Sequence, residues 1–65
     1  MENFGNRLTK LRKDKGLSLE DLAKDLNFHK ITLNMWENSK KVLSISKLIK
    51  IAKYFNVSVD YLLGL

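Results

Sequence analysis

The stretch SLEDLAKDLNFHKITLNMWE, residues 18–37, decides the fold, because it describes two short amphipathic helices with little chain between them. Ser18 can cap the first helix. The acidic residues Glu20 and Asp21 come next, in the first turn, where the positive end of the helix dipole favours negative charge. The inner stripe of this helix, expected over about 18–25, consists of Leu22, Ala23 and Leu26. Asn27 tolerates left-handed backbone and predicts a tight turn, after which a second helix follows over about 29–37.

The second helix carries bulky apolar side chains on both faces. At 100° per residue, Leu33 and Trp36 share one stripe, and we expect them in the core. His29 falls near the edge of that stripe and is interpreted as a turn or cap residue. The opposite side holds Lys30, Ile31, Asn34 and Met35. A chain of 65 residues supports one small core, so we expect this second face to meet an external partner.

Helical periodicity continues on both sides of this stretch. A first helix is predicted over about 3–15, with Gly16 at its end, from the spacing of Phe4, Leu8 and Leu11. A fourth helix is capped by Ser44, ends at Asn56 and has a wide apolar face made of Ile45, Leu48, Ile49, Ala52 and Phe55. A last helix runs from a Ser58 cap to Gly64. No alternating strand pattern is present, so the sequence predicts one all-α domain of five short helices over residues 1–65.

Composition narrows the possible classes of protein. There is no cysteine and one histidine, which excludes disulfides and Cys- or multi-His metal sites and fits a cytoplasmic setting. No apolar run approaches the roughly 20 residues that cross a bilayer. No catalytic group, cofactor site or small-molecule site is marked, and we expect no enzyme. The net charge of +5 suggests a polyanionic partner, nucleic acid or an acidic membrane surface, with simple solubility as the alternative.

Two short helices about three residues apart, in an all-helical basic domain, form a helix-turn-helix by arrangement alone. The chain also resembles the lambda-repressor-like family of DNA-binding domains, which includes Cro and phage repressors. The matching segments, in order, are FGNRLTKLRKDKGLSLEDLA, WENSKK and SISKLIKIAKYFNVSVDYLLGL, which together cover essentially the whole chain. The resemblance implies that the helix from Ser18 lies across the phosphate backbone and that the next helix enters the major groove.

The resemblance also assigns roles away from that helix. Arg12 and Glu37 match a buried ion pair of the family; two independent surface charges are the alternative. The segment with Val57, Val59, Leu62 and Leu63 matches the one through which many members build part of their dimer contact. Val59, Leu62, Leu63 and Leu65 are also more apolar surface than so short a helix needs for its own docking, so we expect a homodimer contact through these four residues. The chain departs from the family in having Leu19 where glutamine is frequent, Asn27 and Ser39 where glycine is frequent, and Leu43 where proline is frequent.

Individual DNA contacts follow from side-chain chemistry. We hypothesise that Ile31 and Met35 lie against thymine methyl groups, Asn34 against adenine, and Lys30 against guanine or phosphate. Phosphate contacts are expected from Ser18, Leu19 (through its backbone N–H), Thr32, Asn38, Lys40 and Lys41. A solvated lysine loop is the alternative for the last two.

The leading hypothesis is therefore sequence-specific binding of double-stranded DNA by a transcriptional repressor or regulator, acting as a dimer on an inverted-repeat operator. The alternative is a protein-interaction module, an anti-repressor or adaptor, that docks a partner on Ile31 and Met35. A membrane-surface role ranks third, because no helix pairs a broad apolar face with a dense cationic one. The residues leave open whether the chain is an intact small regulator or the DNA-binding end of a longer repressor.

Overall fold

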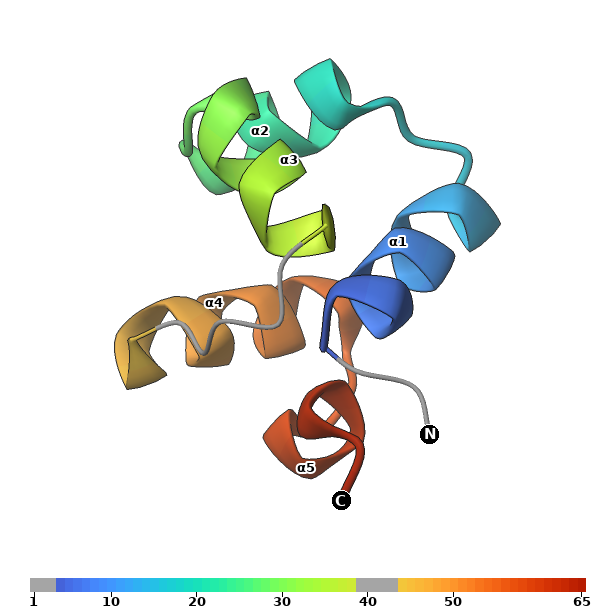
Figure 1. Cartoon of the computed structure of the whole chain (residues 1–65), viewed down its shortest axis with the longest axis vertical. Coiled ribbons are helices and arrows are strands. Elements are labelled where there is room, and N and C mark those ends of the chain that lie inside the picture. The colour runs from blue at the N-terminus through green and yellow to red at the C-terminus, as the bar shows by residue number, and fades with distance from the viewer. Residues whose placement is uncertain (1–3, 39–43) are drawn as a thin grey trace.

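The computed structural model describes residues 4–38 and 44–65, which form five α-helices. In chain order they are α1 (Phe4–Asp14), α2 (Leu19–Leu26), α3 (Lys30–Asn38), α4 (Ile45–Phe55) and α5 (Val59–Leu63). These two ranges contain no strand. In the view of Figure 1, α2 and α3 lie at the upper end of the molecule and α4 and α5 below them, while α1 contacts both α3 and α5. The predicted all-α class and the helix-turn-helix at α2–α3 are confirmed.

Helix ends differ from the prediction by about one residue. Ser18 has extended backbone (φ −79°, ψ 167°) and stands before α2 as its cap, not as its first helical residue. The carbonyl of His29 accepts the first hydrogen bond of α3 from the Leu33 N–H, at 3.1 Å. His29 is thus a cap residue, as interpreted, but its side chain is exposed and does not lie at the edge of the core.

Asparagine ends two of the helices with the same turn. Asn27 after α2 and Asn56 after α4 have positive φ angles of 58° and 56°. In each case the next residue donates its N–H back to the final turn, Phe28 to Ala23 at 2.9 Å and Val57 to Ala52 at 3.0 Å. This is the double hydrogen-bond pattern that usually has glycine at the left-handed position. The tight turn predicted from Asn27 is confirmed, and it sets the direction in which α3 leaves α2.

All five helices contribute to one core. Its ten buried apolar residues, within the described part of the chain, are Phe4, Leu8, Leu22, Ala23, Leu26, Leu33, Leu48, Ile51, Ala52 and Leu62. Burying a leucine of this kind contributes about 1.5–3 kcal/mol. α3 supplies just one of these residues, Leu33, so most of its surface stays available.

The predicted apolar face of α4 is partly wrong. Ile45 and Ile49 are exposed, whereas Ile51, which the prediction omitted, is fully buried beside Leu48 and Ala52. The helix is so rich in apolar residues that two overlapping stripes satisfy helical spacing, and its packing against α2 and α5 selects one of them.

Polar contacts tie the helices together at the edge of the core. The Tyr54 hydroxyl donates a 2.5 Å hydrogen bond to Asp25, which links α4 to α2 and raises the pKa of Tyr54. The Lys15 ammonium lies 4.2 Å from the centre of the Tyr54 ring, and the Arg7 guanidinium lies 4.7 Å from that of Tyr61. One cation on α1 and one just after it are therefore engaged with aromatic rings.

Candidate nucleic-acid interface

The outward face of α3 includes the exposed side chains of Lys30, Ile31, Asn34 and Met35. Ile31 is 75% exposed and Met35 is 57% exposed, whereas Leu33 on the opposite side of the helix is fully buried. Bulky apolar side chains at such exposure on a short helix, beside a lysine and an amide, form a mixed surface that can contact both apolar and hydrogen-bonding groups of a partner.

An amide pair orders the middle of this face. Asn38 donates through its side-chain nitrogen to the backbone carbonyl of Asn34 at 2.8 Å and to the Asn34 side-chain oxygen at 3.1 Å. The Asn34 oxygen keeps a second lone pair, and its amino group keeps two donors. Asn34 can therefore still offer a donor and an acceptor to one partner, while Asn38 is turned toward the helix itself. Thr32 is half-buried on the same helix, and Lys40 and Lys41 lie outside the described residues.

The C-terminal end of α3 is joined to α1 by an ion pair. Arg12 donates from Nε to Oε2 of Glu37 at 2.7 Å and from a terminal nitrogen to Oε1 at 3.1 Å. Its other terminal nitrogen donates to the Leu17 carbonyl at 2.8 Å, and Thr9 donates its hydroxyl to Glu37 at 3.0 Å. The two charged side chains are 12% and 7% exposed. They are thus the mostly buried pair that the family resemblance implied, with Thr9 as a partner that the sequence did not reveal.

Gly5 lets α1 approach the end of α3 closely. A Cβ atom at this buried position would lie 2.5 Å from the Glu37 carbonyl oxygen and 2.7 Å from that of Trp36. Both obstacles are backbone atoms, which cannot rotate away. Gly5 was not among the residues predicted to matter, although a glycine within a helical segment signals close packing or a turn.

The amino end of α2 is ordered by its own side chains. Asp21 donates its N–H to the Ser18 hydroxyl at 3.0 Å, and Ser18 donates its N–H to the Asp21 carboxylate at 3.2 Å. Hydrogen bonds from Ser18 lower the pKa of Asp21, and the one from the Ser18 backbone contributes more than the one from its side chain. This reciprocal capping satisfies two N–H groups at the helix end and fixes its direction.

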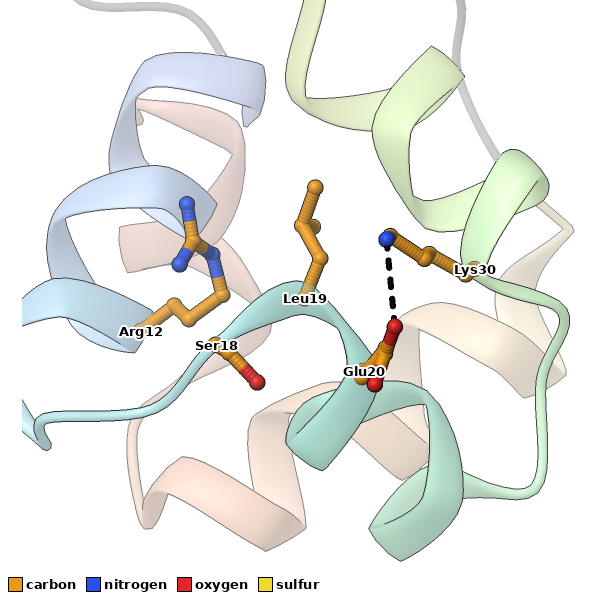
Figure 2. Close-up of a pocket in the computed structure, with 5 residues that line it drawn as sticks. All are labelled: Arg12, Ser18, Leu19, Glu20 and Lys30. Carbon is orange, nitrogen blue, oxygen red and sulfur yellow. Dashed lines mark hydrogen bonds and ion pairs between the residues drawn. The ribbon is translucent and has the colours of Figure 1, made fainter.

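A hollow of about 480 Å³ opens where this end of α2 meets α1 and α3, lined by Arg12, Ser18, Leu19, Glu20 and Lys30. In Figure 2, Arg12 and Lys30 approach it from opposite sides, with the Leu19 side chain standing between them. The Lys30 ammonium donates to Glu20 across the turn, at 3.4 Å between Nζ and Oε1. Both side chains are more than half exposed, at 56% for Lys30 and 67% for Glu20. This second ion pair was not predicted from the sequence.

Aromatic packing fastens the inner side of α3. The rings of Phe28 and Trp36 meet edge to face, with centres 5.2 Å apart. Two lysines of α4 cover them, Lys47 at 5.6 Å from the Trp36 ring and Lys50 at 4.8 Å from the Phe28 ring. Trp36 thus connects α3 to the turn before it and to α4.

The residues expected at a dimer contact fall into three environments. Leu65 is 87% exposed, whereas Leu62 is fully buried in the core. Val59 and Leu63 are half-buried against that core. The assignment of Leu62 to an interface is therefore wrong, because its side chain is needed to dock α5 on its own domain.

The described residues lack a membrane-spanning helix and a metal-binding cluster. No helix within them has the length and apolar character to span a membrane. The same residues hold no cluster of three or more His, Cys, Asp or Glu side chains suited to a metal ion.

Sequence comparison places the chain in a family. The model of the helix-turn-helix family matches residues 8–62, and the chain belongs to that family. It is 39% identical over 62 residues to the HTH-type transcriptional regulator YobD of Bacillus subtilis strain 168. The match covers 95% of this chain and 55% of YobD, so the chain spans about half the length of that relative.

Solved structures show the same arrangement of helices. SinR, a master regulator for biofilm formation solved in complex with DNA, is 35% identical with a TM-score of 0.81, over 91% of this chain and 95% of that one. The P22 c2 repressor, solved with a synthetic operator, is 25% identical with a TM-score of 0.87, over 97% and 96%. The lambda-repressor-like fold expected from the sequence is thereby confirmed.

Proposed function

We propose that this chain binds double-stranded DNA in a sequence-specific manner, with α3 in the major groove. The observation that carries the proposal is the exposed outer face of α3, where Ile31 and Met35 stand beside Lys30 and Asn34. A major groove offers partners for each of these groups: thymine methyls, guanine acceptors and the paired donor and acceptor of adenine. SinR and the P22 c2 repressor, which share the fold, were each solved with DNA.

The amino end of α2 is proposed to meet the phosphate backbone. Ser18 and Leu19 stand at the start of this capped helix, whose backbone N–H groups and dipole favour an anion. Leu19 would act through its N–H, because its side chain packs against the core. The remaining proposed phosphate contacts are Thr32, Asn38, Lys40 and Lys41. Asn38 needs to release Asn34 to make such a contact, since both side chains are hydrogen-bonded to each other.

We further propose that two copies bind one inverted repeat and that the bound dimer regulates transcription. Leu65 is the exposed apolar residue beyond α5, and Val59 and Leu63 on α5 have half-buried side chains. A two-fold contact there would place two copies of α3 about 34 Å apart, one turn of DNA. The similarity to YobD, an HTH-type transcriptional regulator, supports the regulatory role, and the cytoplasm is the location expected for it.

The test is a selection of bound duplexes from a random pool at near-physiological salt. Recovery of one motif repeated in inverted orientation would support both sequence-specific binding and the dimer. Absence of enrichment would contradict the proposal and favour a protein partner for Ile31 and Met35. A parallel selection with Asn34→Ala sharpens the result, because it should relax the preference at one adenine in each half-site and leave the other positions unchanged.

A further inference from the structure

A carboxylate stands at the place where α3 is proposed to meet DNA. Glu20 lies in the first turn of α2, and its Oε1 is 3.4 Å from the ammonium of Lys30, the first residue of α3. Both side chains line the hollow whose residues are drawn in Figure 2. A carboxylate at this place would repel the DNA phosphates and also binds the lysine that is proposed to contact DNA. Its presence there therefore requires an explanation.

The other polar groups that line this hollow have partners of their own. The Arg12 guanidinium is bound by Glu37 and by the Leu17 carbonyl. The Ser18 hydroxyl accepts the N–H of Asp21. Among the described residues that line the hollow, Lys30 is the cation with an exposed ion pair, because the Lys30 and Glu20 side chains are both more than half accessible to solvent. An exposed pair of this kind contributes little to stability and is readily exchanged for other partners.

Helix stability offers a simpler reason for the position of Glu20, since an acidic residue in the first turn favours the helix dipole. Asp21 already occupies that turn and makes the capping hydrogen bond. The dipole does not require that Glu20 reach across the turn to Lys30. The contact between the two side chains is therefore the feature to be explained.

We propose that Glu20 is a specificity-determining residue that acts by positioning Lys30. The inference rests on the proposed DNA binding. An ammonium has three donors, so Lys30 can keep one on Glu20 and direct the others to the O6 and N7 acceptors of a guanine. A phosphate, in contrast, competes with the Glu20 carboxylate for the same cation and is repelled by it. Lys30 consequently adds affinity at a guanine and adds little along DNA of unrelated sequence.

The test compares wild type with Glu20→Gln on two duplexes of equal length, the selected motif and an unrelated sequence. Glutamine keeps the size of the side chain and removes its charge. Binding to the unrelated duplex should strengthen, and its salt slope should steepen by about 0.9, which is roughly a 3.5-fold greater loss of affinity between 50 and 200 mM salt. Binding to the selected duplex should change less, so the ratio of the two affinities should fall.

Two controls separate positioning from bulk charge. Asp14→Asn makes the same change in net charge at an exposed residue at the end of α1, away from the α2–α3 turn, and should leave the affinity ratio unchanged. In a Lys30→Gln background, Glu20→Gln should no longer change the affinity ratio, because residue 30 is then neutral and the lost carboxylate charge acts equally on both duplexes. Circular dichroism melting of each variant checks that the fold is retained.

Three results would overturn the inference. They are an unchanged affinity ratio in Glu20→Gln, an equal shift in Asp14→Asn, and a selected motif without guanine at the position that Lys30→Gln relaxes. All three leave DNA binding itself intact. Failure of the wild-type chain to bind any duplex preferentially would overturn the proposed function as well, so the two failures are distinguishable.

Discussion

The two ends of α3 each carry an ion pair with a neighbouring helix, and the pairs differ in burial. At the C-terminal end, Arg12 holds Glu37 with two hydrogen bonds, the shorter at 2.7 Å, and both side chains are nearly enclosed. At the N-terminal end, Lys30 touches Glu20 at 3.4 Å, and both side chains are mostly in solvent. The same kind of charge pair therefore serves different purposes at the two ends.

Burial decides that difference. A charge that loses its partner in a buried site remains desolvated, which costs several kcal/mol, whereas an exposed charge recovers its hydration. The C-terminal end is accordingly committed to α1, where Gly5 also permits close backbone contact. The N-terminal end remains free to exchange partners, which a surface that binds DNA needs.

Glu37→Ala should have the largest effect on stability. It leaves Arg12 without its carboxylate in a site where the arginine side chain is 12% exposed, and we expect a loss of about 3–5 kcal/mol. That is a large share of the roughly 5–15 kcal/mol typical of a domain. Urea unfolding followed by circular dichroism measures it. Glu20→Ala is the matched variant at the other end and should cost about 1 kcal/mol or less; equal losses would refute the contrast.

Gly5→Ala should rank second. The added methyl meets the backbone carbonyls of Trp36 and Glu37, so α1 has to move away from α3. Overpacking of this kind costs about 1–3 kcal/mol, offset by up to about 1 kcal/mol from the better helix propensity of alanine. Lys10→Ala, at an exposed position of the same helix, provides the control and should not destabilise. A Gly5→Ala protein at least as stable as wild type would show that the two helices are not held in close contact.

Removing the cap at the start of α2 should cause a smaller loss of stability. Ser18→Ala removes the hydroxyl that accepts the Asp21 N–H and should cost about 1 kcal/mol. Ser44 stands at the same position before α4 but makes no side-chain capping hydrogen bond. Ser44→Ala should therefore cost only a few tenths of a kcal/mol. Thermal melting of the two variants side by side makes the comparison, and a reversed order would contradict the capping geometry.

Thymine methyl recognition should give the smallest effect. Replacing a contacted thymine by uracil removes one methyl and should cost about 0.8 kcal/mol or less of binding free energy. In the double variant Ile31→Ala, Met35→Ala the same replacement should cost nothing further. The matched control is Ile45→Ala, Ile49→Ala, which removes exposed apolar groups from α4 and should keep the thymine preference. If wild type binds both duplexes equally, Ile31 and Met35 contact something other than thymine.

Local chemistry was sufficient to predict most of the fold. Ser18 and Asn27 mark the ends of α2 through hydrogen bonding and backbone preference that depend on a few neighbouring residues. The buried side of α5 was harder to predict, because five residues are too few for periodicity to separate Leu62 from Leu63. In α4 apolar residues are so abundant that the prediction placed Ile49 in the core, where it is exposed, and left out Ile51, which is buried.

Contacts between segments that are far apart in the sequence were harder to predict. The Arg12–Glu37 pair spans 25 residues, and only the family resemblance suggested it. Gly5 matters because a backbone carbonyl of α3 lies close to it, and no sequence pattern specifies the position of that carbonyl. The exposure of Ile31 and Met35 was expected from the small size of the core, but their assignment to bases stays a prediction.

The packing around Trp36 makes its intrinsic fluorescence a probe of the structure. Trp36 is the single tryptophan of the chain, and it sits between the Phe28 ring and the Lys47 ammonium on the inner side of α3. Indole emission responds to the polarity and charge around the ring, so its wavelength and quantum yield report how α3 packs against the turn before it and against α4. Unfolding and DNA titrations can thus be followed by intrinsic fluorescence, without a dye attached to the surface under study.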